Sequence, residues 1–141
     1  VGCAQLEEFP SFVERRRHNF DRLHKALEAV SDKLILPVPA QNSTPSWFGF
    51  LITCKEGTSK NTVVQYCQDH GVQTRMLFAG NITKQPVFDE MRKSGKGYRV
   101  IGDLSVTDSI MNNTFWIGVY PGMTDEMIDY MAKTIIEAVN L

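Results

Sequence analysis

The residues best suited to binding a ligand lie close together, within residues 74–86. Arg75 and Lys84 together suit a diphosphate, because the arginine offers a planar fork of donors and the lysine a compact positive charge. The side-chain amides of Asn81 and Gln85 can hydrogen-bond the edges of a sugar or a base. The types and spacing of these residues therefore predict a candidate binding segment.

The same stretch also has a plain structural interpretation. The small Ala79-Gly80 pair would let backbone approach a ligand closely, and Thr83 adds a hydroxyl group. An ordinary strand exit with solvated polar side chains has the same composition, however. From the residue types alone, that strand exit is the simpler interpretation, and both alternatives stay open.

No group of residues on this chain has the spacing of a catalytic centre. His18, His24 and His70 lack metal-ligand spacing, and no serine, cysteine or lysine lies in a recognised nucleophile motif. The glycine-rich basic stretch 94–97 lacks the spacing of a phosphate-binding loop and is better explained as a flexible turn. The sequence therefore predicts no catalytic residue and no metal site here.

The composition is that of one globular domain. Of 141 residues, 43% are apolar and 22% are charged, which is enough to bury a core. A net charge of -1 argues against a nucleic-acid partner, and no apolar run approaches the ~20 residues that span a bilayer. Residues 1–8 do not resemble a signal peptide, and Cys3, Cys54 and Cys67 form no C-x-x-C pair. We therefore expect a cytoplasmic protein with buried, reduced thiols.

Apolar residues repeat with the period of a helix across residues 1–31. The stripe consists of Leu6, Phe9, Val13, Phe20, Leu23, Leu27 and Val30. Pro10 removes one amide donor, so we expect the helix to kink or restart there. The basic run 15–18 is expected to form a solvated face. A helix of this length with one apolar stripe must lie along another surface.

Beyond residue 31, short apolar strands alternate with amphipathic helices. Strands are predicted at 34–36, 47–54, 72–78 and 114–120, and helices at 59–70, at 105–112 and from 125 towards the end. Ser59 and Thr124 are expected to cap two of the helices, and Ser105 with Asp108 forms a capping box for the third. The strand 47–54 is uncharged and nearly all apolar, which predicts cover on both of its faces.

The order of these elements defines the fold class. A long helix precedes two strands, a helix, a strand, a long loop, a helix, a strand and a final helix. The loop is residues 79–102, which show no strong period, and loops of that length are often functional. The order predicts an α/β (α+β) domain in two layers, with a sheet of about three to four strands covered by helices on one face.

Several segments are similar to a known family. They read TRMLFAGNITKQPVF at 74–88, YRVIGDL at 98–104, IMNNTFWIGVYPGMT at 110–124, PSWFGFLI at 45–52 and VGCAQLEEFPSFVERRRHNF at the start. Together they resemble the C-terminal region of the DegT/DnrJ/EryC1/StrS family of sugar aminotransferases. Within it, the sequence is most similar to the branch of nucleotide-sugar 3-dehydrases typified by CDP-4-keto-6-deoxyglucose 3-dehydrase of lipopolysaccharide synthesis.

The resemblance implies the small domain of a type I aminotransferase fold. Residues 1–31 would be the long helix arriving from a large cofactor domain, and residues 32–141 the small domain itself. The family works as homodimers on nucleotide-diphosphate sugars with pyridoxamine or pyridoxal phosphate. The dehydrase branch uses a histidine in place of the Schiff-base lysine, and the CDP-sugar enzymes add a two-iron two-sulfur cluster and a partner reductase. These parts belong upstream of Val1, so the chain alone is expected to bind no cofactor and to be inactive.

The resemblance also assigns residues to the substrate pocket. In the family, the loop after the T-R strand reaches over the cofactor and touches the sugar. The matching positions here are Arg75, Phe78, Gly80, Asn81, Thr83, Lys84 and Gln85. No catalytic role follows for any histidine or cysteine of this chain, and Trp116 and Tyr120 are expected in the core or the pocket wall.

Two other functions remain open. A nucleotide-sugar aminotransferase of the same family would differ at a residue upstream of Val1, where lysine stands in place of histidine. A free-standing ligand-binding α/β module is the alternative of another class, because a fold alone does not fix a function. The apolar stripe of the first helix argues against the module, since such a face usually meets a partner.

Overall fold

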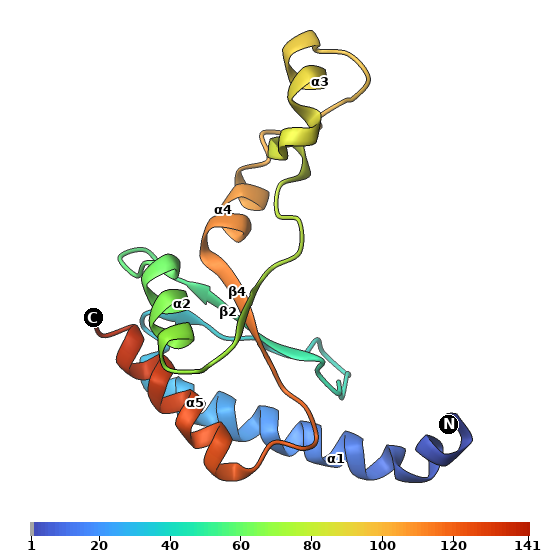
Figure 1. The fold of residues 1–141 in the computed structure, drawn as a ribbon, viewed down its shortest axis with the longest axis vertical. Helices are drawn as coiled ribbons and strands as arrows, with labels where there is room; N and C mark the ends of the chain where they lie inside the picture. Colours follow the sequence, from blue (N-terminus) through green and yellow to red (C-terminus); the bar gives the residue numbers. More distant parts are fainter. Residues whose placement is uncertain (1) are drawn as a thin grey trace.

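A computed structural model describes residues 2–141, and its centre is one antiparallel sheet (Figure 1). The strands are β1 (Leu34–Ile35), β2 (Gly49–Cys54), β3 (Thr74–Met76) and β4 (Thr114–Gly118), in the spatial order β1-β2-β4-β3. Every neighbouring pair is antiparallel. The predicted small sheet is confirmed, and β1 is an edge strand, as the flanking prolines indicate.

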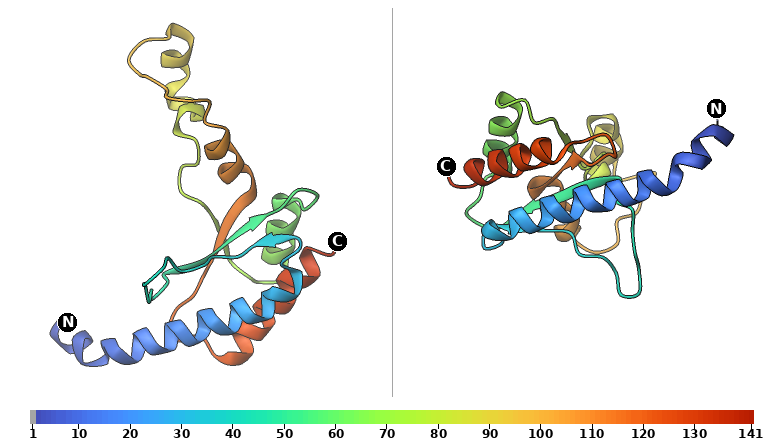
Figure 2. Two further views of the ribbon diagram at one scale, coloured as in Figure 1. Left: turned by 180° about the vertical axis from the view of Figure 1, so that it is seen from behind. Right: turned by 90° about the horizontal axis from the view of Figure 1, so that it is seen from below.

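Three helices cover one face of this sheet: α1 (Gly2–Leu27), α2 (Lys60–Asp69) and α5 (Asp125–Ala138). Figure 2 shows α1 and α5 lying side by side beneath the strands, and the two helices contact each other along their length. The buried side chains of this layer include Leu23, Leu27, Phe50, Ile52, Val63, Cys67, Phe115, Ile117, Ile128 and Ile135. The predicted two-layer architecture is therefore confirmed.

The other face of the sheet is partly open. Along β2, Phe50, Ile52 and Cys54 are buried, whereas Leu51 and Thr53 on the opposite face are half-buried. The prediction that this strand is covered on both faces is wrong for the described residues, because side chains alternate and the helices lie on one side only. Trp116 of β4 is also half-buried on the open face, where it is paired with Leu51.

Helix α1 continues through Pro10 without a break, so the predicted restart does not occur. Proline leaves one carbonyl in the preceding turn without a donor, but residues 2–10 are exposed, so water can satisfy that carbonyl. Leu6 and Phe9 are 69% and 58% exposed, so the first part of the predicted stripe covers nothing in the described chain. A 3-10 turn, η1 (Glu28–Val30), ends the segment. No helix within residues 2–141 is long and apolar enough to cross a membrane.

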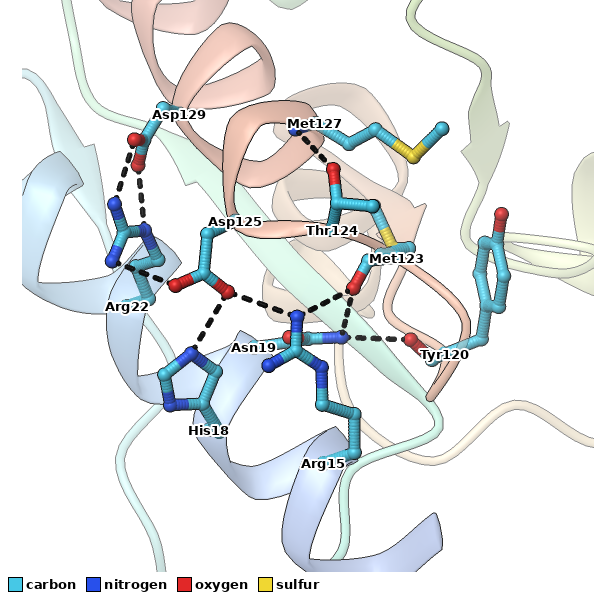
Figure 3. A network of polar contacts seen from close by, with 10 residues as sticks. All are labelled: Arg15, His18, Asn19, Arg22, Tyr120, Met123, Thr124, Asp125, Met127 and Asp129. Atoms are coloured by element: carbon cyan, nitrogen blue, oxygen red, sulfur yellow. Dashed lines mark hydrogen bonds and ion pairs between the residues drawn. The ribbon is translucent and has the colours of Figure 1, made fainter.

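The basic run of α1 is not the solvated face that the sequence predicts. Arg15 donates to the carboxylate of Asp125 at 2.9 Å, and His18 Nε2 lies 3.0 Å from the same oxygen (Figure 3). Arg22, one turn further along, forms a two-pronged contact with Asp129 at 2.7 Å for both bonds. The cations recur every three or four residues and face acids spaced four apart on α5, a complementarity that appears only once the two helices are adjacent.

This network makes the stability of the fold depend on pH. Hydrogen bonds from His18 and Arg15 hold the pKa of Asp125 below its ordinary value, and Arg22 does the same for Asp129. A carboxyl whose pKa is lowered by folding stabilises the fold above its unfolded pKa of about 3.9, and that contribution is lost as pH falls through the folded value.

We therefore expect Asp125→Asn to destabilise the protein more at pH 7 than at pH 3. Urea unfolding at both values measures this difference, with Asp32→Asn as the control, since Asp32 is exposed and has no ion pair within the described residues. Equal destabilisation by Asp125→Asn at the two pH values would contradict the ion-pair account.

Two of the three predicted helix caps are confirmed. Ser59 accepts from the amide of Thr62 at the start of α2, and Thr124 accepts from Met127 at the start of α5. The capping box of α4 (Ser105–Asn113) is wrong. Leu104 is the N-cap residue, and Ser105 is the first helical residue, whose amide and hydroxyl both donate to Asp103 Oδ1.

Residues 77–113, which we name the arm, extend away from the layered body (Figure 1). The predicted loop within it contains two short 3-10 turns, η2 (Ile82–Lys84) and η3 (Pro86–Phe88), and the helix α3 (Asp89–Ser94). The prediction of a structureless connection is therefore wrong in this part. These pieces are three to six residues long, too short for a hydrophobic period to reveal them.

Candidate functional site

The binding segment lies where β3 passes into the arm. The chain turns there through two residues with left-handed backbone, Phe78 with φ of 45° and Gly80 with φ of 62°. A Cβ on Gly80 would lie 2.5 Å from Cγ of Met111, on α4. Glycine is required at this position, but the close neighbour is a methionine of the same chain and not the ligand that the sequence suggests.

Asn81 holds the turn together from inside. It is 2% exposed, and its Oδ1 accepts from the amide of Thr83 at 3.1 Å and from the Thr83 hydroxyl at 2.7 Å. Its Nδ2 donates to Oδ1 of Asp108 at 2.7 Å. The predicted role of Asn81 as a sugar contact would require breaking these bonds, so the structure favours a supporting role for its side chain.

Lys84 sits at the surface of the same turn. Its ammonium group lies 2.8 Å from Oδ2 of Asp108, and its side chain is 55% exposed. An ammonium group has three donors, so those not used by Asp108 remain available to a phosphate oxygen. Hydrogen bonds from Lys84 and Asn81 hold the pKa of the Asp108 carboxyl below its ordinary value, which keeps the carboxylate ionised at neutral pH.

The outer side of the turn is fastened to α3. Gln85 donates from Nε2 to the carbonyl of Ala79 at 2.6 Å. Arg92 donates to the carbonyl oxygens of Thr83 and Gln85 and forms an ion pair with Asp89. Arg92 and Asp108 are the residues that sequence reasoning missed. The only signal for Arg92 is the acid three positions earlier, which by itself indicates no more than a helical pair.

Arg75 is not brought together with Lys84. Its guanidinium contacts the carbonyl of Thr74 at 3.0 Å and the side chain of Gln73 at 3.4 Å, both within its own segment. It lines a separate groove of 690 Å³ between the edge of the sheet and α5. Trp116 and Tyr120 also line this groove.

Phe78 presents its ring to solvent. The residue is 85% exposed although its backbone is in the left-handed region, which costs a non-glycine residue roughly 1–3 kcal/mol. The ring separates two grooves, one of 130 Å³ that reaches Trp116 and one of 420 Å³ that reaches Met111. An exposed aromatic face held beside a groove suits stacking against a flat or apolar ring face.

The grooves beside Phe78 differ in chemistry from a phosphate-binding site. The grooves beside Phe78 are lined mainly by apolar side chains such as Leu77, Ile82 and Ile110, whereas a phosphate needs amide or cationic donors. Cys54 and Cys67 are buried, and desolvation raises the pKa of each to about 11, so both are protonated thiols. Neither is poised to ligate an iron–sulfur cluster. Within residues 2–141 no group of three metal-binding side chains occurs.

The sequence matches the model of the DegT/DnrJ/EryC1/StrS aminotransferase family over residues 1–136. The chain belongs to this family. The family assignment confirms the resemblance carried by the sequence segments at 45–52, 74–88, 98–104, 110–124 and the start of the chain.

Two curated relatives are similar to nearly the whole chain. The chain is 46% identical over 138 residues to lipopolysaccharide biosynthesis protein RfbH of Salmonella typhimurium, which covers 96% of this chain. It is 41% identical over 141 residues to dTDP-4-dehydro-2,6-dideoxy-D-glucose 3-dehydratase of Saccharopolyspora spinosa, which covers 99% of this chain. The chain spans only 30% and 29% of the length of these two relatives.

Solved structures confirm the fold. The aminotransferase TlmJ from Streptoalloteichus hindustanus superposes with a TM-score of 0.80 at 20% identity, over 99% of this chain and 35% of that one. A variant of GDP-4-keto-6-deoxymannose-3-dehydratase with bound GDP-perosamine gives 0.77 at 23% identity, over 95% and 33%. The predicted aminotransferase-type fold is thereby confirmed.

Proposed function

We propose that this chain forms the small domain of a nucleotide-sugar 3-dehydratase that works in deoxysugar and lipopolysaccharide synthesis. The similarity to RfbH and to a dTDP-sugar 3-dehydratase supports the activity. The turn at residues 78–84 is the observation that supports the site most directly. It exposes the ring of Phe78 and the ammonium of Lys84, while its buried Asn81 is held by hydrogen bonds within the chain.

Each side chain has a distinct task in this proposal. Lys84 binds the diphosphate of the nucleotide sugar with the donors that Asp108 leaves free. Phe78 supports a ring face of the substrate, and Gly80 with Asn81, Thr83 and Gln85 fixes the turn from which both project. Arg75 lines a neighbouring groove, and it contacts the substrate only if the nucleotide extends along the edge of the sheet.

The chemistry itself belongs to the rest of the enzyme. Pyridoxamine phosphate, when bound, supplies the electron sink that permits loss of the 3-hydroxyl group. The residues of this chain bind and orient the sugar and exclude water, and the base, any iron–sulfur cluster and the contact with a reductase lie on other parts of the polypeptide. Residues 1–31 would lead from the cofactor domain, with Val1 outside the described residues, and residues 32–141 would form the small domain.

We propose that the complete enzyme is a homodimer and works in the cytoplasm. Val87, Ile101 and Val106 are 78%, 76% and 71% exposed, and all three lie on the arm. Apolar side chains this exposed on one projecting element usually meet another surface. We propose that the arm crosses to the cofactor domain of a second subunit, so that the pocket is completed between subunits.

Lys84→Ala tests the proposed site in the complete enzyme. We expect the KM for a dTDP- or GDP-linked 4-keto-6-deoxyhexose to rise about tenfold, equivalent to ~1.4 kcal/mol of binding, because one charge-assisted bond to the diphosphate is lost. The melting temperature should change by a few degrees at most, since surface ion pairs contribute little. Lys93→Ala, an exposed lysine on α3 of the same arm, is the matched control and should leave KM unchanged.

Three results would count against the proposal. An unaltered KM in Lys84→Ala removes this side chain from the site. Unfolding of the variant shows instead that the Lys84–Asp108 pair is structural. A rise in KM of equal size in both lysine variants would indicate a general charge effect of the arm.

Transamination is the second candidate function, favoured by the superposition on TlmJ. The two reactions give different products from the same substrate: dehydration removes the 3-hydroxyl, whereas transamination leaves an amine on the sugar. Mass spectrometry of the product decides between them.

A free-standing binding module would instead predict that the chain alone binds nucleotide sugars. We expect no such binding and no visible cofactor absorption from the chain alone.

A further inference from the structure

We propose that Asp108 is the positioning residue of the substrate site, acting through Lys84. This inference rests on the proposed function, because it assumes that Lys84 meets the substrate. Asp108 lies on α4, 24 residues from Lys84 in sequence, and its two carboxylate oxygens serve two different residues of the turn. One oxygen accepts from Asn81 inside the turn, and the other accepts from Lys84 at its surface.

The geometry explains why such a residue is needed. Lysine carries a flexible four-carbon stem, so holding its ammonium in one place costs rotamer entropy. A carboxylate at 2.8 Å selects one position of that ammonium before the substrate arrives. Because the same carboxylate also holds the buried Asn81, its own position is fixed by the interior of the turn. Asp108 thereby fixes the position of the Lys84 ammonium relative to the turn.

Contacts that do not involve Asp108 also hold α4 in place. Helix α4 is joined to the body by the ammonium of Lys60, which donates to the carbonyl of Met111 at 2.7 Å. It is joined to the turn by the fit of Gly80 against Met111 and by the amide of Asn81, 3.2 Å from the sulfur of Met111. These contacts stay in place when Asp108 is changed, so loss of its charge should move the lysine and leave the helix where it is.

A double-mutant cycle on the complete enzyme tests this role. Asp108→Asn is the informative variant, because its amide oxygen can still accept from Asn81 while the charge that holds Lys84 is lost. With a dTDP- or GDP-linked 4-keto-6-deoxyhexose as substrate, we expect Asp108→Asn alone to raise KM about three- to fivefold with kcat within about twofold. In the Lys84→Ala background the same change should leave KM unaltered, because the group it positions is already gone.

The outcomes separate the inference from the proposed function. One outcome is that Lys84→Ala raises KM while Asp108→Asn raises KM by the same factor in the wild-type enzyme and in the Lys84→Ala enzyme. In that case Asp108 acts independently of Lys84, so the inference fails and the proposed site stands. If neither variant changes KM, the proposed site itself is wrong. A fall in kcat with unchanged KM in Asp108→Asn would also overturn a positioning role in binding. Glu90→Gln, at an exposed position of α3 on the same arm, controls for loss of one negative charge.

Discussion

Replacing Phe50 by alanine should lower the free energy of unfolding by about 3–5 kcal/mol. Its side chain is fully buried at the centre of the layer between sheet and helices. Its ring lies 4.8 Å from that of Phe20 on α1, measured between centroids, so it joins the first helix to the sheet. Truncation removes a large apolar side chain and leaves a cavity that packed neighbours cannot fill.

The neighbouring aromatic residue supplies the control. Phe48 is 73% exposed, and its ring is tilted against that of Trp116 with the centroids 5.3 Å apart. Phe48→Ala should therefore cost at most about 1 kcal/mol. Urea unfolding of the two variants provides the comparison. A cost for Phe48→Ala that equals or exceeds that of Phe50→Ala would show that the open face of the sheet, and not the helical face, carries the core.

Gly80→Ala should have the second-largest effect, this time on substrate binding. A methyl group there meets Met111 at 2.5 Å and also strains a backbone with φ of 62°. Moving the turn away from α4 would relieve the clash, and it would displace Lys84 from Asp108. We expect KM to rise by more than about tenfold, the factor assigned to loss of the Lys84 contact alone.

Gly95→Ala is a closely matched control. Gly95 has φ of 65°, almost the same as Gly80, but a Cβ there would have no neighbour within 4 Å. Both substitutions carry the left-handed strain of about 1–2 kcal/mol, and only Gly80→Ala adds the clash. Steady-state kinetics should show unchanged KM for Gly95→Ala, and Met111→Ala should partly restore Gly80→Ala. Equal effects of the two glycine variants would mean that strain, not contact with α4, governs the turn.

The helices and strands of the body are those that the sequence predicts. The period of the apolar residues places α2 and α5, and the caps at Ser59 and Thr124 fix where they begin. These features are local, so a single segment contains all the information they need. Apart from the short helical pieces within residues 79–102, the element order is also confirmed, and with it the two-layer sheet and helix arrangement.

What the sequence does not predict depends on contacts between distant segments. The cations of α1 look solvated until α5 places Asp125 against them, over 100 positions away. The amide of Asn81 is predicted to contact a ligand, but in the structure it donates to Asp108. Arg75 and Lys84 are predicted to form one site, but Arg75 lines a separate groove beside the sheet. In each case the residue type is read correctly, and the missing information is the identity of its neighbour.

Hydrogen–deuterium exchange on the complete enzyme tests the central claim most directly. Cofactor-loaded enzyme would be compared with and without a saturating dTDP- or GDP-linked 4-keto-6-deoxyhexose, with the peptides of residues 78–88 and those of α2 followed side by side. Binding should slow exchange in residues 78–88, leave α2 unchanged, and protect much less in Lys84→Ala. Unchanged exchange across residues 78–88 in an enzyme shown to be saturated would mean that the arm does not contact the substrate.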